Sequence, residues 1–82
     1  MSNKYRVIRT DYLFDGEAHP TYTIHRCVYA KPEDVVPVKY GKQEAAPEGE
    51  SIEELRGDLQ LMLAALERPI LMTKRDKLVE VK

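Results

Sequence analysis

Residues 51–69, SIEELRGDLQLMLAALERP, constrain the fold of this chain more than any other segment. Ser51 fits a helix N-cap, and Glu54 three residues later completes the capping-box pattern. At about 100° per residue, the large apolar side chains fall in one stripe about 100° wide, namely Ile52, Leu55, Leu59, Met62, Leu63 and Leu66. Pro69 disfavours helical geometry at the residue before it. We therefore predict one amphipathic helix that packs this stripe on the rest of the chain.

Three strands are expected before the helix. Residues 4–14 and 21–30 are rich in β-branched and aromatic side chains, and the Asp15-Gly16 pair between them is a strong signal for a hairpin turn. Residues 35–40, VVPVKY, form a weaker third strand, because Pro37 lacks a backbone donor and suits a sheet edge. Residues 41–50, GKQEAAPEGE, are expected to form a mobile loop.

The segment after the helix is short. Residues 69–73, PILMT, fit a fourth strand or an extended cover. Residues 74–82, KRDKLVEVK, could add another strand or fray, so they, like residues 1–3, are candidates for disorder. The predicted fold is a single α+β domain over residues 1–82. It has a small antiparallel sheet of three or four strands in β-β-β-α-β order, with the helix packed on one face.

Charge and composition restrict the partners of the chain. Its 82 residues have a net charge of −1, so no overall field attracts nucleic acid or anionic membranes. The charge is uneven: residues 1–30 sum to +1, residues 31–67 to −5 and residues 68–82 to +3. The Tyr-rich strands carry scattered arginines without an RNA-binding signature, so nucleic acid is not an expected partner.

Targeting and cysteine use indicate the compartment. A single cysteine excludes an intramolecular disulfide, and MSNKYRVIRT has no apolar signal-peptide core. No stretch approaches the roughly 20 apolar residues of a membrane span. We expect a bacterial-type cytoplasmic protein without a membrane partner.

The first candidate site lies in YTIHRCVY, residues 22–29. His25 and Cys27 are two residues apart and share one face of a strand, and His19 is the only other histidine. These three are the candidate metal ligands, although a transition-metal site usually needs three or four. A mid-strand thiol has no helix N-terminus to lower its pKa. We therefore expect neither a metal nor a cofactor, and the absence of catalytic motifs argues against an enzyme.

The second candidate site is an interaction surface. On the far side of the helix from the apolar stripe, the spacing GxxxLxxAA gathers Gly57, Leu61, Ala64 and Ala65. A mid-helix glycine costs about 1 kcal/mol against alanine unless a close approach compensates. On the second strand His25, Cys27 and Tyr29 form a second partly apolar face that a single helix would leave uncovered. Either face could contact the C-terminal segment or another subunit, whereas the alternative is an ordinary exposed surface.

Two resemblances add expectations. YRVI, YTIHRCVY and GESIEELRGDLQLMLAALERPIL together resemble a family of small uncharacterised bacterial proteins known mainly from structural genomics, which implies no activity or site residues. The hairpin, third strand and GESIEELRGDLQLMLAAL are also similar to HicB-type antitoxins, which bind a toxin and often DNA through an added C-terminal domain. Only 14 residues run from Pro69 to Lys82, too few for that domain, and the 41–50 loop departs from the short connection expected.

The sequence thus favours a non-enzymatic protein-interaction module of unknown function that contacts another protein or self-associates. One alternative is an antitoxin-like regulator that binds a protein or nucleic acid. A second alternative is a small metal- or thiol-dependent site at His25 and Cys27.

Overall fold

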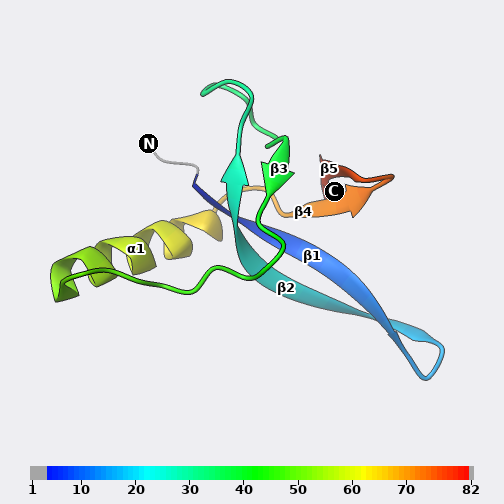
Figure 1. The fold of residues 1–82 in the computed structure, drawn as a ribbon. Helices are drawn as coiled ribbons and strands as arrows, with labels where there is room; N and C mark the ends of the chain where they lie inside the picture. The colour runs from blue at the N-terminus through cyan, green and yellow to red at the C-terminus, as the bar shows by residue number, and fades with distance from the viewer. Residues whose placement is uncertain (1–3, 82) are drawn as a thin grey trace.

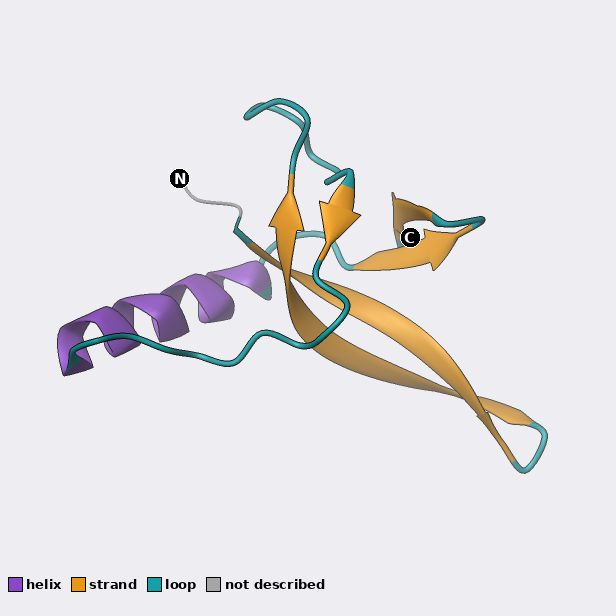
Figure 2. Ribbon diagram, in the orientation of Figure 1, coloured by secondary structure: helices purple, strands orange, loops and turns teal. Residues whose placement is uncertain are grey.

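The computed structural model describes residues 4–81, which form five strands and one helix (Figure 1). In chain order the elements are β1 (Tyr5–Phe14), β2 (Glu17–Val28), β3 (Lys39–Tyr40), α1 (Ile52–Ala65), β4 (Leu71–Lys74) and β5 (Lys77–Glu80). The expected α+β class with a single main helix is confirmed for this range. Figure 2 shows the helix projecting to one side of the sheet and the β1–β2 hairpin projecting to the other.

The β1–β2 hairpin is the longest element of the sheet. Its antiparallel register runs without interruption from Tyr5↔Arg26 to Phe14↔Glu17. The two-residue turn has positive φ at both positions, 53° at Asp15 and 78° at Gly16, which is the conformation that an Asp-Gly pair favours between twisted strands. Residues 10–22 are all exposed, so the outer half of the hairpin is an arm that no other described element covers.

The sheet differs from the prediction in strand number and in one pairing. Its order is β3-β2-β1-β4-β5, and β4 runs parallel to β1 with Ile8 opposite Leu71. The predicted antiparallel sheet in β-β-β-α-β order therefore fits in part, because the order holds but a fifth strand is added and the β1–β4 pair is parallel. A parallel neighbour requires a long crossover, and here residues 41–70, including α1, supply it.

The fifth strand, β5, lies in the segment for which the sequence left a further strand or fraying open, because its turn lacks glycine. β4 and β5 pair across Arg75 and Asp76, whose φ values are 53° and 65°. Asp tolerates the left-handed region better than most residues, but KRDK gives no strong turn signal. Part of the segment considered for disorder thus forms strand β5, while Lys82 and residues 1–3 lie outside the described residues.

The sheet curls until its outermost strands face each other. Val38 and Tyr40 from the β3 region and Leu78 from β5 line one open cavity of about 250 Å³. The third strand is also shorter than the expected 35–40, because Pro37 has no donor and pairing resumes only where the Val38 amide donates to the Val28 carbonyl at 2.8 Å.

The expected mobile loop follows the edge of β2 and then the helix (Figure 1). The Gly41 amide donates to the Arg26 carbonyl at 2.9 Å, and the Ala45 amide donates to the Ile24 carbonyl at 2.8 Å. Its mobility stays a prediction, but these bonds place it as a partial extension of the sheet.

The core lies between α1 and one face of the hairpin. Its buried members are Tyr5, Val7, Met62 and Ala65, against which Ile24, Ala45, Leu61 and Ile70 pack. On the opposite face of β1, Ile8 is buried together with its β4 partner Leu71. Both faces of β1 are therefore covered at its N-terminal half.

The predicted orientation of the helix was wrong. Four of the six stripe residues, Ile52, Leu59, Leu63 and Leu66, are 48–71% exposed, whereas Met62 is 7% exposed. The helix instead packs through Asp58, Leu61, Met62 and Ala65, a side centred roughly 100° around the helix axis from the apolar stripe. The inward side carries a polar contact at Asp58, described next.

Candidate interaction surface

The start of α1 is fixed by its cap and by a close backbone approach. The extended Ser51 (φ −142°, ψ 165°) accepts a hydrogen bond on Oγ from the Glu54 amide at 3.1 Å, which confirms the predicted N-cap. Gly49 lies so near the first turn that a Cβ there would sit 2.5 Å from the Leu55 nitrogen. Glycine at position 49 thus allows the incoming loop to lie against the helix.

Asp58 lies on the inward side of the helix and is hydrogen-bonded there. Its side chain is 8% exposed and accepts hydrogen bonds from the Tyr5 hydroxyl at 2.5 Å and from the Glu48 amide at 2.9 Å. A buried carboxylate is costly unless it is hydrogen-bonded, so the helix can bury Asp58 only in the rotation that presents it to these two donors.

The electrostatics of this pair keep the carboxyl charged and the phenol protonated. The hydrogen bond from Tyr5, followed by that from the Glu48 amide and the charges of Lys4 and Arg26, lowers the pKa of Asp58 against an opposing contribution from burial. Burial, followed by the hydrogen bond to Asp58, raises the pKa of Tyr5. The Tyr5–Asp58 contact is therefore a charge-assisted hydrogen bond near neutral pH.

This rotation leaves an apolar surface in solvent. Because Asp58 faces inward, Ile52, Leu59, Leu63 and Leu66 face outward, and we call these four residues the outer face. Leu55 lies half-buried beside them, and the exposed Arg56 interrupts the row between Ile52 and Leu59. Exposed apolar side chains gathered on one side of a helix are where a protein contact surface is first sought, so the outer face is the candidate interaction surface.

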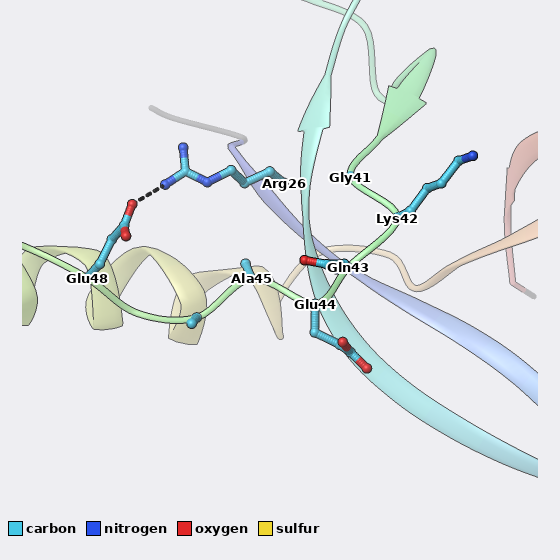
Figure 3. Close-up of a pocket in the computed structure, with 8 residues that line it drawn as sticks. Arg26, Gly41, Lys42, Gln43, Glu44, Ala45 and Glu48 are labelled. Carbon is cyan, nitrogen blue, oxygen red and sulfur yellow. Dashed lines mark hydrogen bonds and ion pairs between the residues drawn. The ribbon is translucent and has the colours of Figure 1, made fainter.

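Open, charged cavities lie where the loop crosses from β2 to the helix. One of about 580 Å³ is lined by Arg26, Gly41, Lys42, Gln43, Glu44, Ala45, Ala46 and Glu48 (Figure 3). Arg26 spans it toward Glu48, with 3.5 Å between Nη2 and Oε1, and its guanidinium lies 5.6 Å from the centre of the Tyr5 ring. The basic Arg26 and the acidic Glu48 that line this cavity thus form an ion pair with each other.

The structure places His25 in the interior. Its Nδ1 donates to the Gly41 carbonyl at 2.6 Å, because a carbonyl oxygen can only accept, and its Nε2 lies at hydrogen-bond distance, 2.7 Å, from the Thr23 hydroxyl. The Tyr40 ring packs edge-on against the imidazole at 5.5 Å. Both ring nitrogens are engaged within the chain, so His25 fixes the β2–β3 connection.

The other predicted ligands are not brought to His25. Cys27 is half-buried, and burial raises the pKa of its thiol against the opposing charge of Arg6, which disfavours the reactive thiolate. His19 is exposed beside the hairpin turn, 4.0 Å from the Glu17 carboxylate, and is six residues or about 20 Å of strand away from His25. Within residues 4–81, no group of three or more His, Cys, Asp or Glu side chains is arranged to hold a metal.

Sequence reasoning missed Arg6, which covers the His25 side of the sheet. It is fully buried, and Nη1 donates to the Tyr29 hydroxyl at 3.1 Å and to the Val35 carbonyl at 2.5 Å, while Nη2 donates to the Pro69 carbonyl at 2.8 Å. Its Nε is buried with no hydrogen-bond partner among the described residues. One guanidinium thus ties the β2–β3 loop to the end of the helix. An arginine inside an apolar run, YRVI, was the available signal.

The two halves of the predicted interaction surface do not meet. Ala65 is buried in the core, Leu61 packs against it, and Gly57 is half-buried with open space around it, while Ala64 is exposed. His25, Cys27 and Tyr29 lie on the opposite face of the hairpin, with Arg6. Much of each half is therefore occupied by contacts within the protein.

Comparison of the chain with protein-family models, with curated proteins and with solved structures found no match. Among residues 4–81, α1 is too short and too polar to be a membrane-spanning helix, and no other helix is present there.

Proposed function

We propose that this chain is a cytosolic, non-enzymatic protein-interaction module that binds its partner through the outer face of α1. The observation that carries the proposal is the orientation of the helix. Asp58 holds four large aliphatic side chains in water on a domain whose own buried core is small. Covering them is favourable by about 25 cal/mol per Å² of apolar surface removed from water.

The character of the surface favours protein over nucleic acid. The outer face carries Arg56 but is bordered by Glu53 and Glu67, so it offers little positive charge to phosphates. The hairpin arm has Arg9 against Asp11, Asp15 and Glu17, which gives it a net negative charge. An antitoxin-like regulator that acts through protein contact is compatible with this proposal.

Nucleic-acid binding is the weaker alternative and rests on a different place. Lys74, Arg75 and Lys77 are exposed around the β4–β5 turn and give this end of the chain local positive charge. If this turn contacts phosphates, oligonucleotide affinity should fall steeply with salt, and Arg75→Glu should weaken it at every sequence. Absence of binding at low salt would remove the alternative.

Site-specific photocrosslinking tests the proposed function. A photoreactive amino acid in place of Leu63 is expected to give a discrete crosslinked species in the native cell. The matched control replaces Leu13, which is 81% exposed at the hairpin tip and lies outside the outer face. If Leu63 yields no more crosslinked product than Leu13, the outer face is not the contact surface and the proposal is wrong.

A further inference from the structure

We infer that the outer face binds the outer face of a second copy of this chain, as an antiparallel pair of α1 helices related by a two-fold axis at Leu59. The inference rests on the proposed function, because it names the partner for the same surface. Two properties of the helix support it, the spacing of its apolar side chains and the distribution of its charges, and the size of the exposed area sets how strong the pair can be.

The apolar side chains are arranged symmetrically about Leu59. Ile52 and Leu66 lie seven residues before and after it, and Leu55 and Leu63 lie four residues before and after it. In an antiparallel pair centred on Leu59, Ile52 of one copy meets Leu66 of the other, Leu55 meets Leu63, and Leu59 meets itself. A two-fold interface must be self-complementary in this way, and a heptad-like spacing keeps such contacts on one side of each helix.

The charges favour the antiparallel orientation over the parallel one. Glu50, Glu53 and Glu54 cluster at the N-terminal end of the helix, whereas Glu67 and Arg68, which follow its C-terminal end, sum to no net charge. A parallel pair would bring six carboxylates together at one end. The antiparallel pair separates the two acidic clusters by the helix length of about 21 Å, beyond the roughly 8–10 Å screening length, and sets each near the end of the other copy that has no net charge. The two helix dipoles also favour the antiparallel orientation, because they then point in opposite directions.

The area of the outer face sets the strength of the pair. A stripe about 21 Å long and about 10 Å wide is small for an interface, and contacts that bury less than roughly 1,200 Å² in total are typically weak or transient. We therefore expect monomer and dimer to interconvert on dilution. Side chains at the centre of such a contact carry most of its affinity, which makes Leu59 the position to change.

The first experiment measures mass against concentration for the full chain by sedimentation equilibrium. The wild type is expected to shift from 9.5 kDa toward twice that mass as concentration rises. Leu59→Asp should weaken the dimer by roughly 30-fold or more, as expected for a central hot spot. Leu13→Asp on the hairpin arm should leave the dimer unchanged, and far-ultraviolet circular dichroism should confirm that both variants remain folded.

The second experiment tests the orientation by thiol crosslinking in a Cys27→Ala background. Leu59→Cys alone should form a covalent dimer with a short bis-maleimide, because it is the residue on the two-fold axis. Ile52→Cys alone should not, since the two copies lie at opposite ends, whereas mixing Ile52→Cys with Leu66→Cys should give a heterodimer. Efficient crosslinking by Ile52→Cys alone would indicate a parallel pair and overturn the orientation.

The outcomes separate the inference from the function on which it rests. A chain that stays monomeric at every concentration overturns the self-pairing. If Leu63 then crosslinks to a different protein in the cell, the outer face still binds a partner and the proposed function stands. A dimer that Leu59→Asp does not weaken also overturns the inference, because the contact would lie elsewhere.

Discussion

The two sides of α1 have opposite compositions and opposite fates. The side rich in leucine and isoleucine lies in solvent, whereas the side that carries an aspartate and small residues faces the core. Hydrophobicity alone would have oriented the helix the other way. The difference teaches that the apolar stripe of a helix need not be the side that a small domain buries, and that a carboxylate can face the interior when, as here, Tyr5 and the Glu48 amide hydrogen-bond to it.

Adjacent residues on the two sides provide the strongest test of this comparison. Met62→Ala removes a buried side chain and should cost about 2–5 kcal/mol of unfolding free energy. Leu63→Ala, one residue later, should change it by less than about 0.5 kcal/mol at concentrations where the chain is monomeric. Urea unfolding of the two variants measures both values, and a larger loss for Leu63→Ala would mean that the helix buries the leucine side.

The pH dependence of stability tests the contact that sets the orientation. The folded state lowers the pKa of Asp58, so this group contributes stability above its ordinary pKa of about 4, and the contribution is lost as pH falls through the lower folded value. Wild type should therefore lose stability in acid more steeply than Asp58→Asn, which keeps the side-chain shape without the charge. Parallel acid-unfolding curves for the two proteins would contradict a role for the Asp58 charge.

The alkaline limb tests the other partner of the same contact. The folded state raises the pKa of Tyr5, so its contribution is complete below about pH 10 and is lost as pH rises above that value. Tyr5→Phe should be less stable at neutral pH but should lose less on alkaline titration. Tyr12, exposed on the hairpin arm, offers the matched control, since Tyr12→Phe should leave the curve unchanged.

Alanine substitutions of two glycines, one in α1 and one in the loop before it, should change the stability of the chain in opposite directions. An added Cβ at Gly57 meets nothing within 4 Å, so Gly57→Ala should stabilise the helix by about 0.5–1 kcal/mol. Gly49→Ala should destabilise the chain, because its Cβ would meet the Leu55 nitrogen. Thermal unfolding of both variants measures the sign of each change. If Gly57→Ala lowered the stability, another part of the protein would have to lie close to position 57, as the sequence pattern suggested.

Local signals predicted the elements well and their assembly poorly. Ser51 located the start of the helix and Asp15-Gly16 located the hairpin turn, because caps and turns depend on neighbouring residues. The rotation of α1 and the burial of Arg6 depend on partners more than 50 residues away, Tyr5 for Asp58 and Pro69 for Arg6. Periodicity carries no information about such partners. The small residues beside Asp58 in GxxxLxxAA were the one local sign of the inward side.

The candidate site likewise separates what neighbouring residues predict from what depends on distant contacts. Rarity drew attention to His25 and Cys27, but hydrogen bonds to Thr23 and Gly41 make His25 part of the interior. The surface proposed for binding consists of residues first assigned to the core. Their exposure depends on how the helix packs on the sheet, which the sequence of the helix alone does not determine.

The parallel pairing of Ile8 with Leu71 has a consequence for synthesis on the ribosome. Ile8 is translated 63 residues before its neighbour in β4, so one edge of β1 stays without its partner strand while most of the chain is made. An open strand edge is a template for pairing with other nascent chains. A ribosome that stalls before Leu71 would thus hold a hairpin with an unprotected edge, and we expect such a fragment to depend on chaperones until residues 71–74 emerge.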